Sequence, residues 1–253
     1  MKDFSLPVLV IREVAIGEQD KLLTLLSAEK GKFTALARGS KNIRSHKLSA
    51  CALFSYSDMT FRESKDKLQI REATLIEDFF DIRKDLDLLS LASYVAQVLY
   101  TVTTEENGEA DMLSLGLNTL YALAKTDKDP RLIKSVFELR AMLHLGFAPS
   151  LGGCEACGKS GCCLYYFDSR EGTLLCPECR QLQTAPSAKL SLGAETLAAM
   201  QYILCALPKR IFSFSLSETA MNELSIITER FLVTQTDTHY KTLQFYHGLK
   251  NNI

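Results

Sequence analysis

The chain reads GCEACGKS at residues 153–160 and CPEC at residues 176–179. These stretches form a Cys-x2-Cys-x18-Cys-x2-Cys pattern with Cys154, Cys157, Cys176 and Cys179. Two intervening residues let both sulfur atoms of a pair point at one ion, and the linker is long enough for a hairpin that returns the second pair. The pattern predicts one structural Zn2+ ion, held in a ribbon-like module.

The cysteine pattern argues against a catalytic metal. Four thiolates leave no open coordination position for water, and none of the four histidines falls between the first and last of these cysteines. The other four cysteines, Cys51, Cys162, Cys163 and Cys205, are expected as buried or loop thiols. The alternative is that Cys162 or Cys163, which lie inside the same loop, replaces one of the four ligands. Metal binding should therefore fold this segment rather than activate a substrate.

The first cysteine pair overlaps a match to the phosphate-binding pattern G-x4-G-K-[ST], from Gly153 to Ser160. A working loop of that type needs a buried strand before it and a helix after it. Here a helical segment precedes the match, and a short β-prone run from Leu164 to Phe167 follows it. The sequence therefore favours a metal site over a nucleotide site.

Length and composition are those of an ordinary globular protein of two or three domains: 253 residues, 47% hydrophobic and 23% charged. The apolar run from Leu6 to Ile11 is too short for a secretory signal. The uncharged stretch from Leu88 to Thr104 contains polar residues and predicts a buried helix rather than a membrane span. With cysteines in metal-binding spacing, we expect a cytoplasmic protein without membrane contact.

Charge is unevenly distributed, although the net charge is only −1. Residues 1–57 carry nine Lys or Arg against five Asp or Glu, and residues 81–129 carry four against nine. The segment from Lys30 to Ser57 contains no acid. This asymmetry indicates a localised anionic partner, with an ordinary solvated surface as the alternative. The candidate phosphate contacts are Lys32, Arg38, Lys41, Arg44 and Lys47, with Arg12 and Lys21 as weaker candidates.

The first 80 residues predict a β-barrel. The candidate strands cover residues 8–14, 21–26, 32–38, 53–61 and 67–73. Five short strands, with a polar and potentially helical link over 41–49, are typical of an OB-fold. In the third strand, alternation places Phe33 on the face opposite Lys32, which favours Phe33 as a core residue over a base-stacking one.

From residue 81 onward, apolar residues recur at the spacing that is typical of helices. Helices are expected over residues 86–103, 111–125, 130–145, 191–207, 217–234 and 239–249. The predicted fold class is α+β and multidomain. It comprises a five-stranded OB-fold barrel for DNA binding (1–80), an α-helical domain (81–150 and 182–253) and an inserted four-cysteine zinc ribbon (151–181).

Several strings along the whole chain resemble the RecO family of bacterial recombination mediators. They are ARGSK at 37–41, FELR at 137–140, GFAP at 146–149, CEACG at 154–158 and YKTL at 240–243. The chain differs from the family's pattern at Asn42 and His46, where Arg is common. The Leu-Arg…Gly-x-x-Pro…Cys-x-x-Cys-Gly succession is the most distinctive part of this resemblance.

The resemblance implies a non-enzymatic protein that acts in DNA repair and recombination. Members of the family bind single- and double-stranded DNA and anneal complementary strands. With RecR, and in some cases RecF, they help RecA to replace single-strand-binding protein on DNA. The resemblance also implies an apolar pocket with a basic rim for the acidic tail of single-strand-binding protein. Arg131, Lys134 and Arg140 are candidates for that rim, with a solvated helix face as the alternative.

One other class of protein remains open from the residues alone, a zinc-ribbon regulator whose metal loop itself contacts nucleic acid. Residues 154–179 hold two basic against four acidic residues, which disfavours such a contact. An enzyme is disfavoured as well, because the chain shows no convincing nucleophile–base pair.

Overall fold

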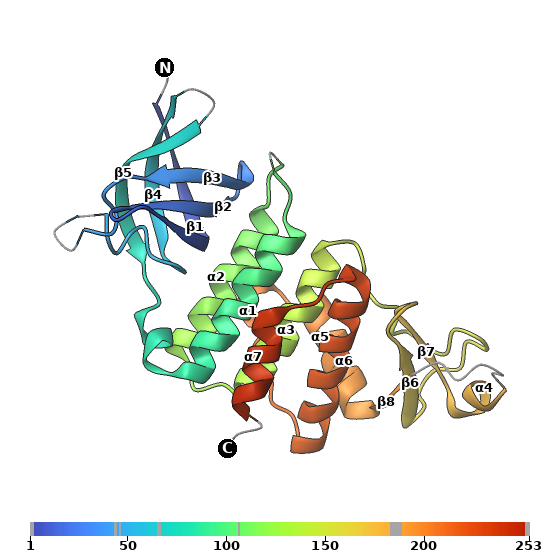
Figure 1. Ribbon diagram of the computed structural model, residues 1–253. Coiled ribbons are helices and arrows are strands. Elements are labelled where there is room, and N and C mark those ends of the chain that lie inside the picture. Colours follow the sequence, from blue (N-terminus) through green and yellow to red (C-terminus); the bar gives the residue numbers. More distant parts are fainter. Residues whose placement is uncertain are drawn as a thin grey trace. The chain divides into compact units, whose positions relative to one another are not determined.

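The computed structural model describes residues 3–42, 45, 47–64, 67–105, 107–182 and 189–250. The chain divides into two compact units, residues 1–127 with 240–253, and residues 128–239. We call them the N-terminal unit and the central unit. Their elements are labelled in Figure 1. The predicted three-part domain division stays a prediction.

The N-terminal unit contains a closed five-stranded barrel with the order β1-β2-β3-β5-β4. Its strands are β1 (Asp3–Ile16), β2 (Asp20–Ser27), β3 (Gly31–Ala37), β4 (Tyr56–Ser64) and β5 (Lys67–Glu77). Neighbouring strands are antiparallel except β3 and β5, which run parallel where Leu36 faces Gln69. This is the strand order of an OB-fold, and it confirms the predicted barrel.

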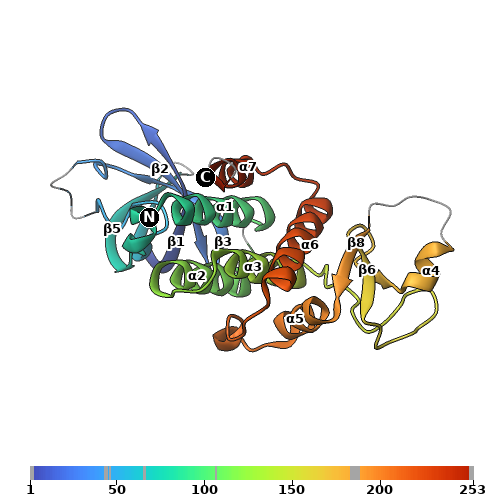
Figure 2. The same ribbon diagram turned by 90° about the horizontal axis from the view of Figure 1, so that it is seen from below.

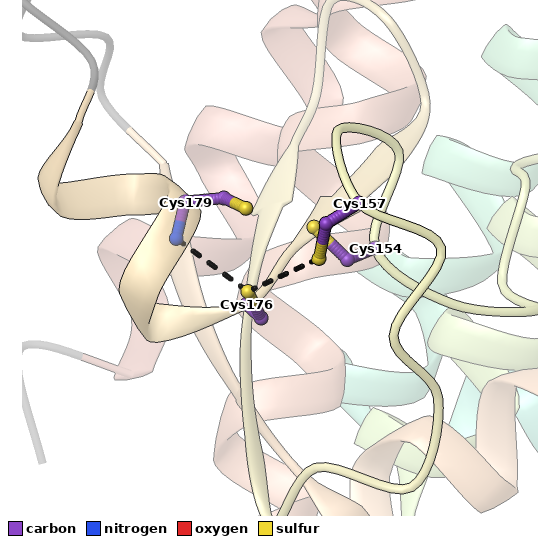
Figure 3. A group of neighbouring side chains, drawn as sticks. All are labelled: Cys154, Cys157, Cys176 and Cys179. Carbon is purple, nitrogen blue, oxygen red and sulfur yellow. Dashed lines mark hydrogen bonds between the residues drawn. The ribbon is translucent and has the colours of Figure 1, made fainter.

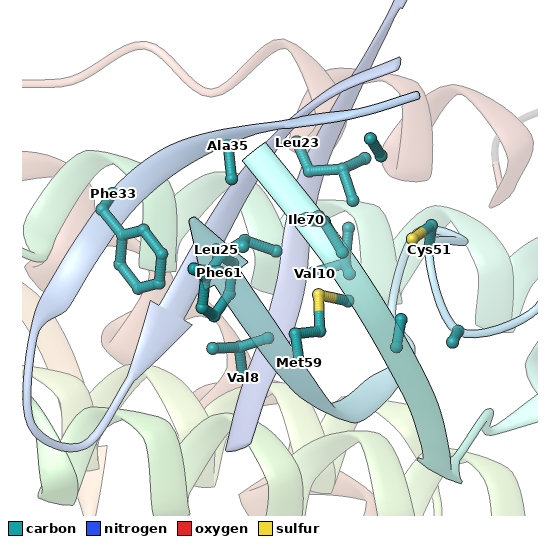
Figure 4. Packing of buried hydrophobic residues seen from close by; sticks show 13 residues of the cluster. Val8, Val10, Leu23, Leu25, Phe33, Ala35, Cys51, Met59, Phe61 and Ile70 are labelled. Carbon is teal, nitrogen blue, oxygen red and sulfur yellow. The ribbon is translucent and has the colours of Figure 1, made fainter. Parts of the chain in front are cut away.

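Strand alternation fills the barrel with side chains from all five strands (Figure 4). Phe33 is 9% exposed and its ring meets the ring of Phe61 edge to face, with centroids 5.4 Å apart. Lys32 and Thr34, its neighbours along β3, lie on the outer face. The prediction that Phe33 is a core residue is therefore confirmed. Burying such a ring contributes about 2–3 kcal/mol.

The connection between β3 and β4 differs from the sequence prediction. Its described residues form turns rather than a helix. The fourth strand begins at Tyr56, not Leu53, because Phe54 adopts a left-handed conformation with φ 68°. The Phe54 N–H donates to the Val10 carbonyl at 2.9 Å, so this turn anchors the chain on β1 before β4 starts.

The described part of the N-terminal unit also contains the short 3-10 helix η1 (Phe80–Lys84) and the α-helices α1 (Leu86–Val102), α2 (Ala110–Lys125) and α7 (Lys241–Lys250). The Asp85 side chain caps α1 by accepting hydrogen bonds from the backbone of Asp87 and Leu88. Helix α7 runs beside α1 (Figure 2), and the rings of Tyr94 and Tyr240 meet edge to face at 5.6 Å. Among the described residues, no helix has the length and apolar character needed to cross a membrane.

The described part of the central unit combines four α-helices and the short 3-10 helix η2 (Pro208–Arg210) with a small sheet. Its helices are α3 (Pro130–His144), α4 (Pro177–Gln181), α5 (Ala194–Cys205) and α6 (Glu218–Thr236). The sheet has the order β7-β6-β8, with β6 (Leu164–Asp168), β7 (Thr173–Leu175) and β8 (Leu190–Gly193). The fourth predicted helix, 191–207, begins at Ala194 rather than 191, because the preceding residues pair with β6 as a strand.

Candidate metal centre and nucleic-acid interface

The four predicted cysteines converge at one point in the central unit (Figure 3). Their Sγ atoms all lie within 4.8 Å of one another, and those of Cys157 and Cys176 are 3.8 Å apart. A tetrahedral ion with metal–sulfur bonds of about 2.3 Å requires sulfur–sulfur separations of about 3.8 Å. The four sulfur atoms therefore fit one metal ion with a closed ligand set.

Short hydrogen-bonded turns of the backbone orient the sulfur atoms of each cysteine pair. In the first, the Gly158 N–H donates to the Cys154 carbonyl at 2.8 Å, and Gly158 has φ +72°, a conformation that suits glycine. In the second, Cys176 is the N-cap of α4, and its sulfur accepts from the Cys179 N–H at 3.5 Å. Each pair thus lies on a tight turn, as the spacing predicts. The residues directly after Ser160 form no helix and lead into the strand β6 at Leu164, so the phosphate-loop match lacks its required context.

The protonation of the cysteines depends on their mutual contacts. Burial raises the pKa of Cys154, but backbone hydrogen bonds from Cys176, Cys157 and Ala156 outweigh burial and lower this pKa to about 6. The pKa of Cys179 is raised, because its thiol hydrogen-bonds to Cys157 and Cys176. Four neighbouring thiolates repel one another unless a cation lies between them. A divalent metal ion supplies that charge.

Two of the predicted phosphate contacts lie close together on the barrel of the N-terminal unit. Arg38 follows β3 directly and is exposed. Lys41 is fixed against the β1–β2 turn, where its backbone N–H donates to the Gln19 carbonyl at 3.0 Å and its Nζ to the Gly17 carbonyl at 3.3 Å. We call Arg38 and Lys41 the basic corner.

The other predicted contacts are placed differently. Lys32 is six residues before Arg38, so about 20 Å separates them along an extended strand. The Lys32 Nζ donates to the Tyr100 carbonyl at 2.7 Å and lies 4.9 Å from the centre of the Tyr100 ring. The Nζ of Lys47 donates to the Ile70 carbonyl at 3.2 Å. Arg44 lies outside the described residues. Phosphate binding by these five residues stays a prediction.

The weaker candidates are engaged within the same unit. Arg12 donates to the Tyr100 hydroxyl at 3.0 Å, and Lys21 pairs with Glu13 at 2.9 Å. Lys32 lines a groove together with its sequence neighbour Lys30 and with Lys67, which is distant in sequence. Position 67 lies outside the acid-free run, so local charge counting did not single it out.

The predicted basic rim on the third helix is wrong, and so is the alternative of a solvated face for Lys134 and Arg140. The Lys134 side chain is 1% exposed and pairs with Glu138 at 3.1 Å and with Glu229 at 2.8 Å. Arg140 is 8% exposed and donates to carbonyl groups at the end of α5, among them that of Ile203 at 3.2 Å.

Arg131 is the third member of the predicted rim, and it is also engaged. Its guanidinium pairs with Asp129 at 2.6 Å and with Glu218. All three cations therefore serve packing within the central unit. None of them offers a free charge at the edge of a pocket.

Comparison with known proteins covers almost the whole chain. Residues 1–79 match the family model described as Recombination protein O N terminal, and residues 83–244 match Recombination protein O C terminal. A DNA repair protein RecO from Acetivibrio thermocellus is 34% identical over 241 residues, which cover 95% of each chain. Proteins of the same name from Thermoanaerobacter sp. (strain X514) and Caldicellulosiruptor saccharolyticus are 29% and 26% identical over 99% of this chain and 100% of the relative.

The fold and the cysteine cluster define a multidomain OB-barrel protein with a metal-ribbon module. The matches along the whole chain identify the family within this class: the chain belongs to the RecO family. Family membership assigns it to DNA repair and confirms the resemblance found in the sequence.

Proposed function

We propose that this protein is a recombination mediator that binds single- and double-stranded DNA and anneals complementary strands. With RecR, it promotes the loading of RecA onto DNA coated by single-strand-binding protein, with RecF as a further partner at the nucleoid. The observation that carries the proposal is the closed OB barrel whose third strand and following loop form the acid-free basic run. OB barrels bind nucleic acid through a cationic surface that follows the backbone.

Annealing follows from charge neutralisation. Two DNA strands repel each other through their phosphates, and bound lysine and arginine side chains release condensed counterions and reduce that repulsion. Arg38 is exposed at the basic corner and is free to approach a phosphate. Complementary bases then have time to pair. No bond is made or broken in this process, so the proposed role is non-enzymatic.

The metal is proposed to be Zn2+, with a structural role. Four thiolates suit zinc, and a closed set of ligands provides no position for a reacting water. The alternative of a zinc-ribbon nucleic-acid regulator is less well supported, because Lys159 in the metal loop is paired with Glu178 at 2.9 Å. The module is therefore proposed to stabilise the central unit rather than to read DNA.

An annealing assay tests the proposal. Two complementary oligonucleotides carrying a fluorophore and a quencher are mixed with the protein, with and without single-strand-binding protein. We expect annealing to accelerate, and to slow as salt screens the phosphate contacts. A mixture with non-complementary strands is the control. Unchanged annealing, together with no binding to either form of DNA, would reject the proposed function.

A further inference from the structure

The segment 154–179 contains six of the chain's eight cysteines, and the metal centre uses four of them. The other two, Cys162 and Cys163, follow the first ligand pair on the same loop. Neither is packed into a core, because Cys162 is half-buried and Cys163 is exposed. Partly exposed thiols that bind no metal remain available for reaction. The loop therefore carries two thiols that the metal centre does not use.

Hydrogen bonds hold Cys162 beside the turn of the first ligand pair. The Cys162 N–H donates to the Tyr165 hydroxyl at 3.2 Å, and that hydroxyl donates to the Lys159 carbonyl at 3.2 Å. The same carbonyl accepts the Cys154 N–H at 2.9 Å. Tyr165 is 1% exposed, so water competes little for these bonds. Cys162 is thus fixed next to the metal centre by contacts that do not involve a metal.

The four ligands of the metal centre differ in their access to solvent. Cys154 and Cys176 are 3% and 0% exposed, and Cys179 is half-buried. Cys157 is exposed. Oxidation of a cysteine follows its thiolate character and its exposure, and metal ligands are thiolates. A small oxidant therefore reaches Cys157 before the other three ligands.

The exposed ligand and the nearer unused thiol are joined by a short, adaptable piece of chain. Four residues separate Cys157 from Cys162. Two of them, Gly158 and Gly161, have φ +72° and +73°. Glycine adopts both signs of φ at little cost, so this piece can bring its ends to the Cα separation of about 6 Å that a disulfide needs.

We propose that Cys157 and Cys162 form a peroxide-sensitive thiol pair whose oxidation releases the metal ion. The inference rests on the proposed zinc centre and not on DNA binding. First, the Cys157 thiolate attacks hydrogen peroxide, the O–O bond breaks, and Cys157 sulfenic acid and hydroxide form. The Cys162 thiol then attacks the Cys157 sulfur, the S–O bond breaks, and a disulfide forms while the thiol proton leaves with the hydroxyl group as water. Two electrons pass from the two cysteines to the peroxide.

A thiol outside the metal centre is a better partner for the sulfenic acid than another ligand. The Cys176 sulfur lies 3.8 Å from that of Cys157, but as a ligand it directs its lone pair to the metal. Cys162 attacks without breaking a second metal–sulfur bond. The disulfide removes one ligand of four, and the three cysteines that remain should lose most of their metal.

Peptide mapping of the full-length, zinc-loaded protein tests for the disulfide. The protein receives about one equivalent of hydrogen peroxide, its free thiols are alkylated, and it is digested with trypsin. Trypsin cleaves after Lys159, so Cys157 falls in peptide 141–159 and Cys162 in peptide 160–170. We expect these two peptides to be joined by a bond that dithiothreitol cleaves, with fragment ions assigning it to Cys157 and Cys162. A disulfide between any other cysteines, or none at all, would overturn the inference.

Recovery of the metal gives a second readout, measured with a zinc-binding dye. Cys162→Ser keeps all four ligands and should bind zinc as the wild type does. After about a tenfold excess of peroxide, followed by dithiothreitol and zinc, the wild type should regain nearly all its metal and Cys162→Ser at most about half. The reason is that a sulfenic acid without a thiol partner is oxidised further to sulfinic acid, which dithiothreitol does not reduce.

Cys163→Ser is the matched control, since it removes the neighbouring thiol and leaves Cys162 in place. It should regain its metal as the wild type does. Equal recovery in Cys162→Ser and the wild type would reject the role of Cys162. A wild-type protein that holds no metal before oxidation would instead reject the proposed zinc centre. Zinc that is bound, and is then either retained under peroxide or released without the Cys157–Cys162 bond, rejects only the thiol pair.

Discussion

The Lys159 ammonium lies 2.9 Å from the Glu178 carboxylate and so joins the loop of the first cysteine pair to the helix of the second. Both side chains are largely exposed, at 51% and 72%. Exposed ion pairs contribute little to stability, because water screens the attraction and two long side chains must be ordered. The cysteines themselves, rather than this ion pair, must hold the two turns together.

Lys159→Ala should therefore leave both the bound metal and the thermal unfolding midpoint unchanged. Metal content by inductively coupled plasma mass spectrometry and a thermal melt check this. The same variant tests the phosphate-loop match, because Lys159 occupies its lysine position. Magnesium-dependent ATP binding in the wild type that disappears in Lys159→Ala would contradict the structural role of this loop.

Cys176→Ser should abolish stoichiometric metal binding and unfold the metal module. Cys176 is fully buried, and its sulfur lies among the other three. Structural zinc sites contribute on the order of 10 kcal/mol to folding of their own segment, so a three-cysteine site should lose most of its metal. Metal analysis and proteolysis of residues 154–182 measure this.

Cys163→Ser is the matched control for the metal centre. Cys163 lies in the same loop, is exposed and is not part of the cluster. One Zn2+ per chain is expected in this variant, as in the wild type. Loss of metal from Cys163→Ser, with retention in Cys176→Ser, would reverse the assignment of ligands.

Lys134→Ala should destabilise the central unit by about 3–5 kcal/mol, because it leaves the buried Glu138 carboxylate without its cation. The Thr228 hydroxyl still donates to Glu138 at 2.7 Å, but it carries no charge. Lys134→Met combined with Glu138→Gln should recover most of the loss. Urea unfolding of the wild type, Lys134→Ala and the double variant measures the loss of stability. If Lys134→Ala were as stable as the wild type, the Lys134–Glu138 pair would contribute nothing measurable to stability.

Gly31→Ala should destabilise the barrel more than Gly17→Ala. Both glycines have left-handed backbones, with φ +62° and +60°, so alanine costs about 1–2 kcal/mol at either position. At Gly31 the added Cβ would also collide with the backbone oxygens of Asn107 and Thr104, whereas nothing lies within 4 Å at Gly17. Equal unfolding midpoints for the two variants would show that the 104–107 segment moves away at little cost.

Arg38→Ala with Lys41→Ala should weaken binding to single-stranded and duplex DNA alike. If both residues contact phosphates, the slope of log affinity against log salt should fall by up to about two. Binding measured across a salt series gives the slope, and Lys84→Ala with Lys125→Ala is the charge-matched control. An unchanged slope would show that Arg38 and Lys41 do not contact DNA phosphates.

Local sequence patterns predicted much of this fold. Two-residue spacing between cysteines is enough to direct both sulfur atoms of a pair to one point, so the cluster was predictable from spacing alone. The core position of Phe33 followed from strand alternation, which is a property of the strand itself. Family strings predicted the RecO relationship, which the full-length comparisons confirm.

Contacts between distant segments decided the rest. Leu190–Gly193 became a strand because β6 pairs with it, although the sequence continues the helical pattern. Lys134 and Arg140 read as surface cations, yet partners about 60–95 residues away bury them. Lys67 lines one groove of the barrel with Lys30 and Lys32, a relation that exists only once the barrel closes. The sequence by itself therefore determined the cysteine cluster and most of each barrel strand, since both arise from the spacing of neighbouring residues. Only the tertiary structure decided which charges face solvent, because that depends on what other segments pack against them.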